Sequence, residues 1–205
     1  MSKADILDQL IAEEMVLQVE GRFIGQEIIV LESTTSTNDS ILERAGTDTA
    51  EGLVIFAEHQ TAGRGQRGNR WESVRGKGLW FSMLLRPCIQ ISESAQLTTW
   101  AATSLASSIE RITSRKTEVK APNDVLLDGR KIAGVLVEMR ARAKAPHLVI
   151  AGIGINVNQS LSDFSDGLRT RATSLALISG RAMDRQKFAI EVLRDLDRSY
   201  GERFA

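Results

Sequence analysis

The chain is poor in the residues that build disulfide frameworks and metal centres. Cys88 is its only cysteine, so neither an intrachain disulfide nor a cysteine metal cluster can form. His59 and His147 are its only histidines, which argues against a histidine-built zinc site. From the sequence we therefore expect no resident metal site.

An excess of charge and a long apolar run are missing as well. Lys plus Arg and Asp plus Glu number 26 each, so the formal net charge is zero, which argues against a protein that coats nucleic acid. No apolar run approaches membrane-spanning length, and the N-terminus lacks the apolar segment of a signal peptide. The 205 residues suffice for one domain with a real core. We expect a cytoplasmic protein without a membrane partner.

What the chain does have is a regular succession of apolar patterns. They predict an α+β domain with one mixed β-sheet backed by helices, in an element order unlike that of an alternating βαβ fold. Helices are expected over 3–19, after Asn38 to about Ala45 (capped by a small polar residue), over 92–113 (capped by Ser92), over 173–178 (capped by Thr173) and from Asp184 onward. Strands are expected over 26–32, 53–57, 78–86 and 147–157, with a hairpin around Asp128-Gly129.

A loop rich in glycine and arginine follows the apolar run 53–57. Its glycines, within residues 63–68, spell G-x-G-x-x-G, but no helix with an apolar stripe follows, which argues against a dinucleotide fingerprint. Glycine gives the loop backbone freedom, and arginine offers forked donors for carboxylate or phosphate. Trp71 adds a flat face for a ring. We interpret the segment as a cationic loop over an anionic ligand; the alternative is a surface turn with solvated charges.

Other polar residues cluster where apolar patterns end. A helix cap explains one side chain of the run 33–38, and the surplus either faces a ligand or belongs to a plain turn. Asp124 and Lys131 begin the two arms of the hairpin and can line the same sheet face. Gly152 and Gly154 leave one side of their strand without side chains, so something can approach the backbone closely there.

These clusters together suit a ligand with a neutral polar head and an anionic tail. Neutral donors and acceptors read amide or urea groups, whereas Arg64, Arg67, Lys120 and Lys131 suit carboxylate and phosphate. A carboxylate that attacks the α-phosphate of ATP needs positioning and charge neutralisation more than a protein nucleophile. The chain has no Walker A sequence.

From about residue 28 onward the chain resembles the catalytic domain of the biotin–protein ligases (biotin–acetyl-CoA-carboxylase ligases). The matching motifs are Ser36-Thr37-Asn38, Gln60 with residues 63–68 and Trp71, Lys120 with residues 122–124, residues 130–134 with Glu138, residues 152–156 and residues 172–175. The resemblance implies the fold of class II aminoacyl-tRNA synthetases. It also implies a two-step reaction, in which biotin and Mg²⁺-ATP give biotinyl-5′-AMP and the acyl group passes to a lysine of a biotin carboxyl carrier protein.

The resemblance also implies a role for each matching residue. Biotin would be bound by Ser36, Thr37, Asn38, Gln60, Arg64, Gly65, Gln66 and Lys131. ATP or the adenylate would be bound by Arg67, Trp71, Lys120, Asn123 and Asn156. Lys131, Arg64 and Asp124 would be catalytic, with Lys131 as the principal cation and Asp124 helping the incoming lysine to lose its proton.

Two departures and two missing segments qualify the resemblance. Gln66 stands where many members have an arginine, and Ala121 replaces the usual tryptophan of the Lys-Trp-Pro-Asn-Asp run. The 35 residues before Ser36 are too few for a winged-helix domain, so we expect residues 1–205 to be a single domain without a DNA partner. We expect the small C-terminal β-barrel domain of relatives to be absent or truncated. The resemblance leaves a homodimer open.

Two rival interpretations stay open. A lipoate or octanoyl protein ligase shares the fold and also transfers an acyl group to a lysine of a carrier protein. A non-catalytic module that only binds biotin is the rival of another class, since a fold alone does not guarantee chemistry.

Overall fold

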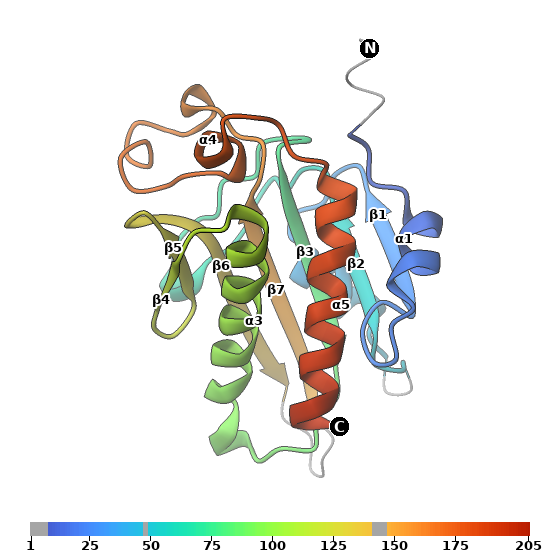
Figure 1. Ribbon diagram of the computed structural model, residues 1–205. Coiled ribbons are helices and arrows are strands. Elements are labelled where there is room, and N and C mark those ends of the chain that lie inside the picture. Colours follow the sequence, from blue (N-terminus) through green and yellow to red (C-terminus); the bar gives the residue numbers. More distant parts are fainter. Residues whose placement is uncertain (1–7, 47–48, 141–146) are drawn as a thin grey trace.

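The computed structural model describes residues 8–46, 49–140 and 147–205. These residues form one seven-stranded sheet with the strand order β1-β2-β3-β7-β6-β5-β4 (Figure 1). Strands β1 and β2 run parallel, whereas the other neighbouring strands pair antiparallel, so the predicted mixed sheet is confirmed. The strands are β1 (Glu27–Leu31), β2 (Leu53–Ala57), β3 (Gly78–Leu85), β4 (Thr117–Lys120), β5 (Asp124–Leu127), β6 (Arg130–Arg140) and β7 (Leu148–Asn156).

Helices pack on both faces of this sheet. On one face α3 and α5 lie side by side (Figure 1), and their apolar stripes form the main core with the sheet. On the other face α2 packs against β2, β3 and β7, around a smaller apolar cluster that includes Ile41. The α-helices are α1 (Ala12–Val19), α2 (Thr37–Arg44), α3 (Ala95–Thr113), α4 (Leu175–Ser179) and α5 (Arg185–Phe204), and the 3₁₀ turns are η1 (Gln66–Gly68), η2 (Ile91–Glu93) and η3 (Leu161–Asp163).

The central strands present a different set of residues to each face. In β7 the odd-numbered residues of Val149–Ile155 join the core with α3 and α5, whereas Gly152 and Gly154 point to the opposite face. Strand β3 repeats the pattern, with Phe81 in the core and Ser82 on the opposite face. One face is therefore filled with apolar side chains, whereas the other combines a smaller apolar cluster under α2 with small and polar residues that leave room for other groups.

The parallel pairing of β1 and β2 decides where the polar segments meet. Parallel strands end at the same edge of a sheet, so the loops that follow β1 and β2 lie next to each other. Backbone bonds join these loops, from Thr34 N to His59 O at 3.1 Å and from Ala62 N to Thr35 O at 2.9 Å. Residues 36–38 and Gln60 are thereby brought to one place.

The β5–β6 hairpin contains a tight turn and a bulge. Asp128 and Gly129 have φ values of 51° and 71°, which is the geometry of the predicted two-residue turn. Pairing then shifts by one residue, because Leu126 opposes Lys131 whereas Val125 opposes Ala133. The extra residue turns the side chain of Lys131 to the face that carries the glycines.

Several predicted helix starts are wrong. Within the described residues the first helix starts at Ala12, not at residue 3, and residues 3–7 of that prediction lie outside the described part. Ser92 does not cap a helix; it lies inside η2, and α3 begins at Ala95. Ser174 rather than Thr173 caps α4, by accepting a bond from Leu177 N.

The remaining differences at this level are small. Strand β4 is absent from the predicted elements, because its pattern of partly buried and exposed residues gives no continuous apolar run. The other predicted strands match the structure to within two residues at each end. The final helix opens at Asp184 as predicted, and Asp184 caps α5 by accepting a bond from Lys187 N at 2.8 Å.

Candidate active site

The first part of the site is the start of α2, where residues 36–38 meet Gln60. The Oε1 atom of Gln60 accepts hydrogen bonds from Thr37 N at 2.9 Å and from Thr37 Oγ1 at 3.2 Å. Ser36, a small polar residue as predicted, stands at the N-cap of α2, but its side chain makes no cap bond. Gln60 Nε2 donates to Ser73 Oγ at 3.0 Å, so both ends of this amide are fixed.

A buried polar network continues from α2 into the sheet. The Oγ atom of Ser82 lies 2.5 Å from Asn38 Oδ1 and 2.7 Å from Thr37 Oγ1. Asn38 Nδ2 donates to Glu138 Oε2 at 2.6 Å. Asn38 is 3% exposed and Ser82 is fully buried, so each polar atom needs a partner inside the protein. These bonds fix the orientation of the Asn38 amide at the floor of the site.

Glycines on β6 and β7 allow other side chains to lie directly on the sheet. A Cβ atom on Gly152 would come within 2.2 Å of Asn38 Oδ1, and one on Gly154 within 2.4 Å of Trp71 Cε2. On Gly134 it would lie 2.9 Å from Trp71 Cζ3. The close approach predicted for Gly152 and Gly154 is therefore confirmed, with Asn38 and the Trp71 ring as the approaching groups.

The cationic loop, residues 59–77, folds back over this floor. Trp71 N donates to Gly63 O at 2.9 Å, and the 3₁₀ turn η1 rather than an α-helix follows the first glycines, as predicted. Arg64 Nη1 donates to Asp39 Oδ2 at 2.6 Å and Nη2 to Glu138 Oε2 at 3.2 Å. The hydrogen bond to Asp39 is the main reason that the pKa of Arg64 is raised. The loop is thus tied by charge to α2 and to β6.

Lys131 and Asp124 form an ion pair between the two arms of the hairpin. The Nζ atom of Lys131 lies 2.7 Å from Asp124 Oδ1 and 5.2 Å from the centroid of the Trp71 ring. The backbone of Lys131 is held independently, because its N–H donates to Arg171 O at 2.8 Å and its carbonyl accepts from Thr173 N at 2.9 Å. The segment before α4 therefore fixes the lysine at the bulge.

Two cavities open on this face and share a wall. The first, of about 260 Å³, contains 13 of the 14 residues predicted for the site: Ser36, Thr37, Asn38, Gln60, Arg64, Gly65, Gln66, Arg67, Trp71, Lys120, Asn123, Asp124 and Lys131. The second, of about 460 Å³, contains the remaining one, Asn156. Both cavities are lined by Asn69, Arg70, Trp71, Lys120, Asp124 and Lys131.

The second cavity is completed by the segment that follows β7. Gln159, Phe164 and Arg171 line it, and Gln159 Nε2 donates to Asn156 Oδ1 at 3.1 Å. Asp163 also lines it. Burial acts to raise the pKa of Asp163, but hydrogen bonds from the backbone and side chain of Ser160 outweigh this effect, so the pKa is lowered.

A model of the biotin/lipoate A/B protein ligase family matches residues 30–156. This match covers both glycine-bearing strands, the cationic loop and the hairpin with Lys131. The chain belongs to the biotin/lipoate A/B protein ligase family.

Known members of the biotin/lipoate A/B protein ligase family are similar to most of the chain. A bifunctional ligase/repressor BirA from Bacillus spizizenii is 38% identical over 192 residues, which are 94% of this chain and 59% of that protein. A biotin–[acetyl-CoA-carboxylase] ligase from Mycobacterium tuberculosis is 34% identical over 183 residues, 84% of this chain and 63% of that protein. The chain thus spans about six tenths of the length of these relatives.

Solved structures agree with this assignment. Biotin protein ligase from Aquifex aeolicus in complex with biotin and ATP superposes with a TM-score of 0.73 at 32% identity, over 86% of this chain and 72% of that one. In the described part of this ligase-family chain, no helix is long and apolar enough to cross a membrane. The same residues contain no group of three His, Cys, Asp or Glu side chains that could hold a metal ion.

Sequence reasoning missed four polar residues of this ligase-family site: Asp39, Ser73, Ser82 and Glu138. Glu138 was part of the resemblance but was given no role. Ser82 interrupts the otherwise apolar run of β3, a signal that could have indicated a polar contact on one face. Asp39 and Ser73 carry no comparable signal, because their partners Arg64 and Gln60 come from another part of the chain.

Proposed function

We propose that this chain is the catalytic part of a biotin–protein ligase, which activates biotin with ATP and transfers it to a lysine of a biotin carboxyl carrier protein. The observation that carries the proposal is the position of Lys131 in the wall between the two cavities. A cation at that boundary serves a reaction that joins the ends of two bound anions. The relatives named as biotin ligases and the neighbour with bound biotin and ATP support it.

The first cavity suits biotin. Its floor holds two amides, Asn38 and Gln60, whose orientations are fixed by hydrogen bonds, and fixed polar groups of this kind read a ureido ring. The absence of a side chain at Gly152 lets the Asn38 amide lie close to the sheet, at the floor of this cavity. Arg64, Gly65 and Gln66 form the cover, and the biotin carboxylate then points toward Lys131.

The second cavity suits the nucleotide. Trp71 offers an aromatic face in the shared wall, and Asn156, oriented by Gln159, offers polar atoms to a base. Lys120 lines both cavities, whereas Arg67 and Asn123 line only the first. We assign all three to the phosphates, which would extend from the second cavity into the first. The described residues show no protein metal cluster, so we propose that Mg²⁺ enters on the triphosphate of ATP.

Adenylation then needs little covalent work from the protein. A carboxylate oxygen of biotin forms a bond to the α-phosphorus, and the bond from that phosphorus to the pyrophosphate oxygen breaks. Lys131 neutralises the negative charge that builds up between the two reactants. In the second step the carrier lysine attacks the acyl carbon and AMP leaves. We assign to Asp124, whose Oδ1 lies 2.7 Å from Lys131 Nζ, the acceptance of the proton of the incoming amine.

The test is biotin-dependent exchange of labelled pyrophosphate into ATP, measured on the wild type, Lys131→Ala and Lys116→Ala. Lys116 lines neither cavity, so its variant loses the same charge elsewhere. We expect exchange in the wild type and in Lys116→Ala. In Lys131→Ala it should fall by about 10²–10³-fold, the effect of losing one preorganised charge partner.

Control substrates separate the rival functions. Lipoate in place of biotin should give no exchange; exchange with lipoate alone would identify a lipoate ligase. Binding of biotin by calorimetry without any exchange in the wild type would indicate a binding module. Transfer of labelled biotin to an added carrier domain tests the second step.

A further inference from the structure

The cationic loop has a closure at its base that lies outside both cavities. The loop leaves the sheet at Glu58, directly after β2, and returns at Gly78, the first residue of β3. One backbone bond joins the two ends, from Gly76 N to Glu58 O at 3.2 Å. Between these ends lie Gln60, Arg64 and Trp71, so the geometry of the base sets the position of all three.

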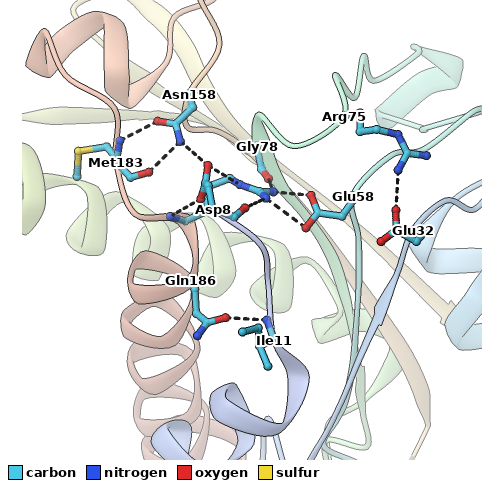
Figure 2. Close-up of polar contacts among 10 residues, drawn as sticks. Asp8, Ile11, Glu32, Glu58, Arg75, Gly78, Asn158, Met183 and Gln186 are labelled. Carbon is cyan, nitrogen blue, oxygen red and sulfur yellow. Dashed lines mark hydrogen bonds and ion pairs between the residues drawn. The ribbon is translucent and has the colours of Figure 1, made fainter. Parts of the chain in front are cut away.

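Arg185, the first residue of α5, binds both ends of this loop. Its Nη1 donates to Glu58 Oε2 at 2.7 Å and to Gly78 O at 3.2 Å, and its Nη2 donates to Glu58 Oε1 at 3.2 Å. Figure 2 shows Glu58 and Gly78 side by side, joined by these contacts. The guanidinium is 2% exposed and the Glu58 side chain 9%, so this pair is buried. A forked cation on a carboxylate fixes direction as well as distance.

The segment before α1 reaches the same guanidinium through Asp8, and Asp8 in turn contacts the segment that follows β7. Arg185 Nη2 donates to Asp8 O, and Arg185 Nε lies 3.1 Å from Asp8 Oδ2. Asn158 Nδ2 donates to Asp8 Oδ2 at 3.0 Å (Figure 2), and Asn158 N donates to Lys77 O at 2.6 Å. Asn158 stands two residues after Asn156. Through Asp8, one buried cation therefore links the loop base to the segment that follows β7.

The position of Arg185 is not explained by stability alone. A cation in the first turn of a helix faces the positive end of the helix dipole, which is unfavourable. A buried ion pair also contributes little net stability, because the desolvation of both charges offsets their attraction. Burial lowers the pKa of Arg185, but Glu58 and Asp8 outweigh that effect and the pKa is raised. What the pair does provide is a fixed geometry at the loop base.

We propose that Arg185 is a positioning residue, which with Glu58 and Gly78 O closes the base of loop 59–77 and so holds Gln60 and Trp71 in their binding positions. This inference rests on the proposed function only for its kinetic readout. Without the closure, the loop would sample more conformations before the ligand binds. The ordering of the loop would then reduce apparent affinity, while the bound geometry would be largely restored.

Two variants test the proposal. Glu58→Met/Arg185→Met replaces the ion pair with apolar side chains, an exchange that often leaves stability unchanged or raises it. Arg185→Lys keeps the charge but loses the fork that contacts both ends. The matched control is Glu32→Gln. Glu32 binds Arg75 of the same loop at 2.8 Å (Figure 2), but both side chains are more than half exposed, so this pair contributes little.

The first readout needs no activity. Trypsin is applied to the full chain without ligands, well below the unfolding midpoint, and cuts after Arg64, Arg67 and Arg70 are quantified by mass spectrometry. We expect about tenfold faster cutting in both test variants and wild-type rates in Glu32→Gln, because cutting follows the open population. Wild-type cutting rates in both test variants would overturn the proposal.

The second readout is the exchange reaction. We expect the KM for biotin to rise roughly tenfold in the double variant while kcat changes less than threefold, because a displaced loop acts first on binding. If the double variant has the stability and the KM of the wild type while Arg185→Lys does not, the role of the ion pair is merely structural. If the double variant fails to fold, the cutting rate and the KM of Arg185→Lys test the proposal instead. If the wild type shows no exchange, the proposed function fails, and the trypsin measurement still tests the closure.

Discussion

The two faces of the sheet are made by the same strands but differ in the residues that they present. Toward α3 and α5 the strands present large apolar side chains that are almost fully buried. Toward α2 and the cationic loop they present a smaller apolar cluster together with glycines and polar residues, on which Asn38 and Trp71 lie. The difference shows how a two-residue alternation can place stability on one face and binding on the other. Substitutions on the two faces should therefore change different measurements.

The largest loss of stability is expected on the face that packs against α3 and α5. Leu105, on α3, is fully buried in the main core, so Leu105→Ala should lower the free energy of unfolding by about 2–5 kcal/mol. Urea unfolding measures this change. Exchange activity at low temperature, per folded molecule, should stay near the wild-type value. A large rise in KM for biotin would show that the two faces are coupled.

A single methyl group on the other face should act on function instead. In Gly154→Ala the new Cβ would lie 2.4 Å from Trp71, so the ring must leave its place in the shared wall. We expect kcat/KM for exchange to fall about 100-fold, the cost of a displacement near 1 Å. The matched control is Ile155→Val, the next residue on the opposite face, which should cost about 0.5–1.5 kcal/mol of stability and little activity.

Stability should depend on pH through Tyr200 of α5, on the face of the sheet that packs against α3 and α5. Tyr200 is 1% exposed, donates to Glu51 at 2.9 Å, and has a raised pKa mainly because of burial. Its contribution to stability is complete below the pKa of the unfolded state, about 10, and is lost as the pH rises above it. The free energy of unfolding should then fall by up to about 1.4 kcal/mol per pH unit. Tyr200→Phe should flatten this slope in urea unfolding at pH 8–11; an unchanged slope would contradict the assignment.

The smallest effect is expected for the partly exposed ion pair that ties the loop to α2. Asp39→Asn removes the 2.6 Å contact with Arg64, whose side chain is 39% exposed. Pairs of this kind contribute about 0.2–1 kcal/mol, so the KM for biotin should rise up to about fivefold. Salt should reduce the difference between variant and wild type, because it screens exposed charges. A difference that grows with salt would exclude a charge effect.

The strands and the long helices could be predicted from the sequence because their apolar periods are strong and local. Turn chemistry at Asp128-Gly129 also reads directly from two residues. Most residues of the candidate site came from short motifs, and the structure brings Ser36 and Lys131 to the same cavity. Their roles stay predictions until the exchange measurements are made.

What could not be predicted depends on contacts between distant segments. The cap of α2 comes from Gln60, 23 residues away from Thr37, so no local pattern reveals it. Thr37 and Gln60 come together because β1 and β2 pair in parallel. The alternation of apolar residues does not show in which direction a strand runs. Arg185 stands 127 residues from Glu58, and its position at a helix start looks unfavourable until the loop base is seen.

The bulge in β6 has a consequence for folding. Because pairing skips Ile132, Lys131 lies on the polar face while Ile132 and Ala133 are both buried in the core. A regular ladder without that skip would turn the ammonium group of Lys131 into the apolar core. An unpaired buried charge costs roughly several kcal/mol, so the misregistered hairpin would be rejected. The lysine that we propose for adenylation would thus also favour the correct strand register while the sheet assembles.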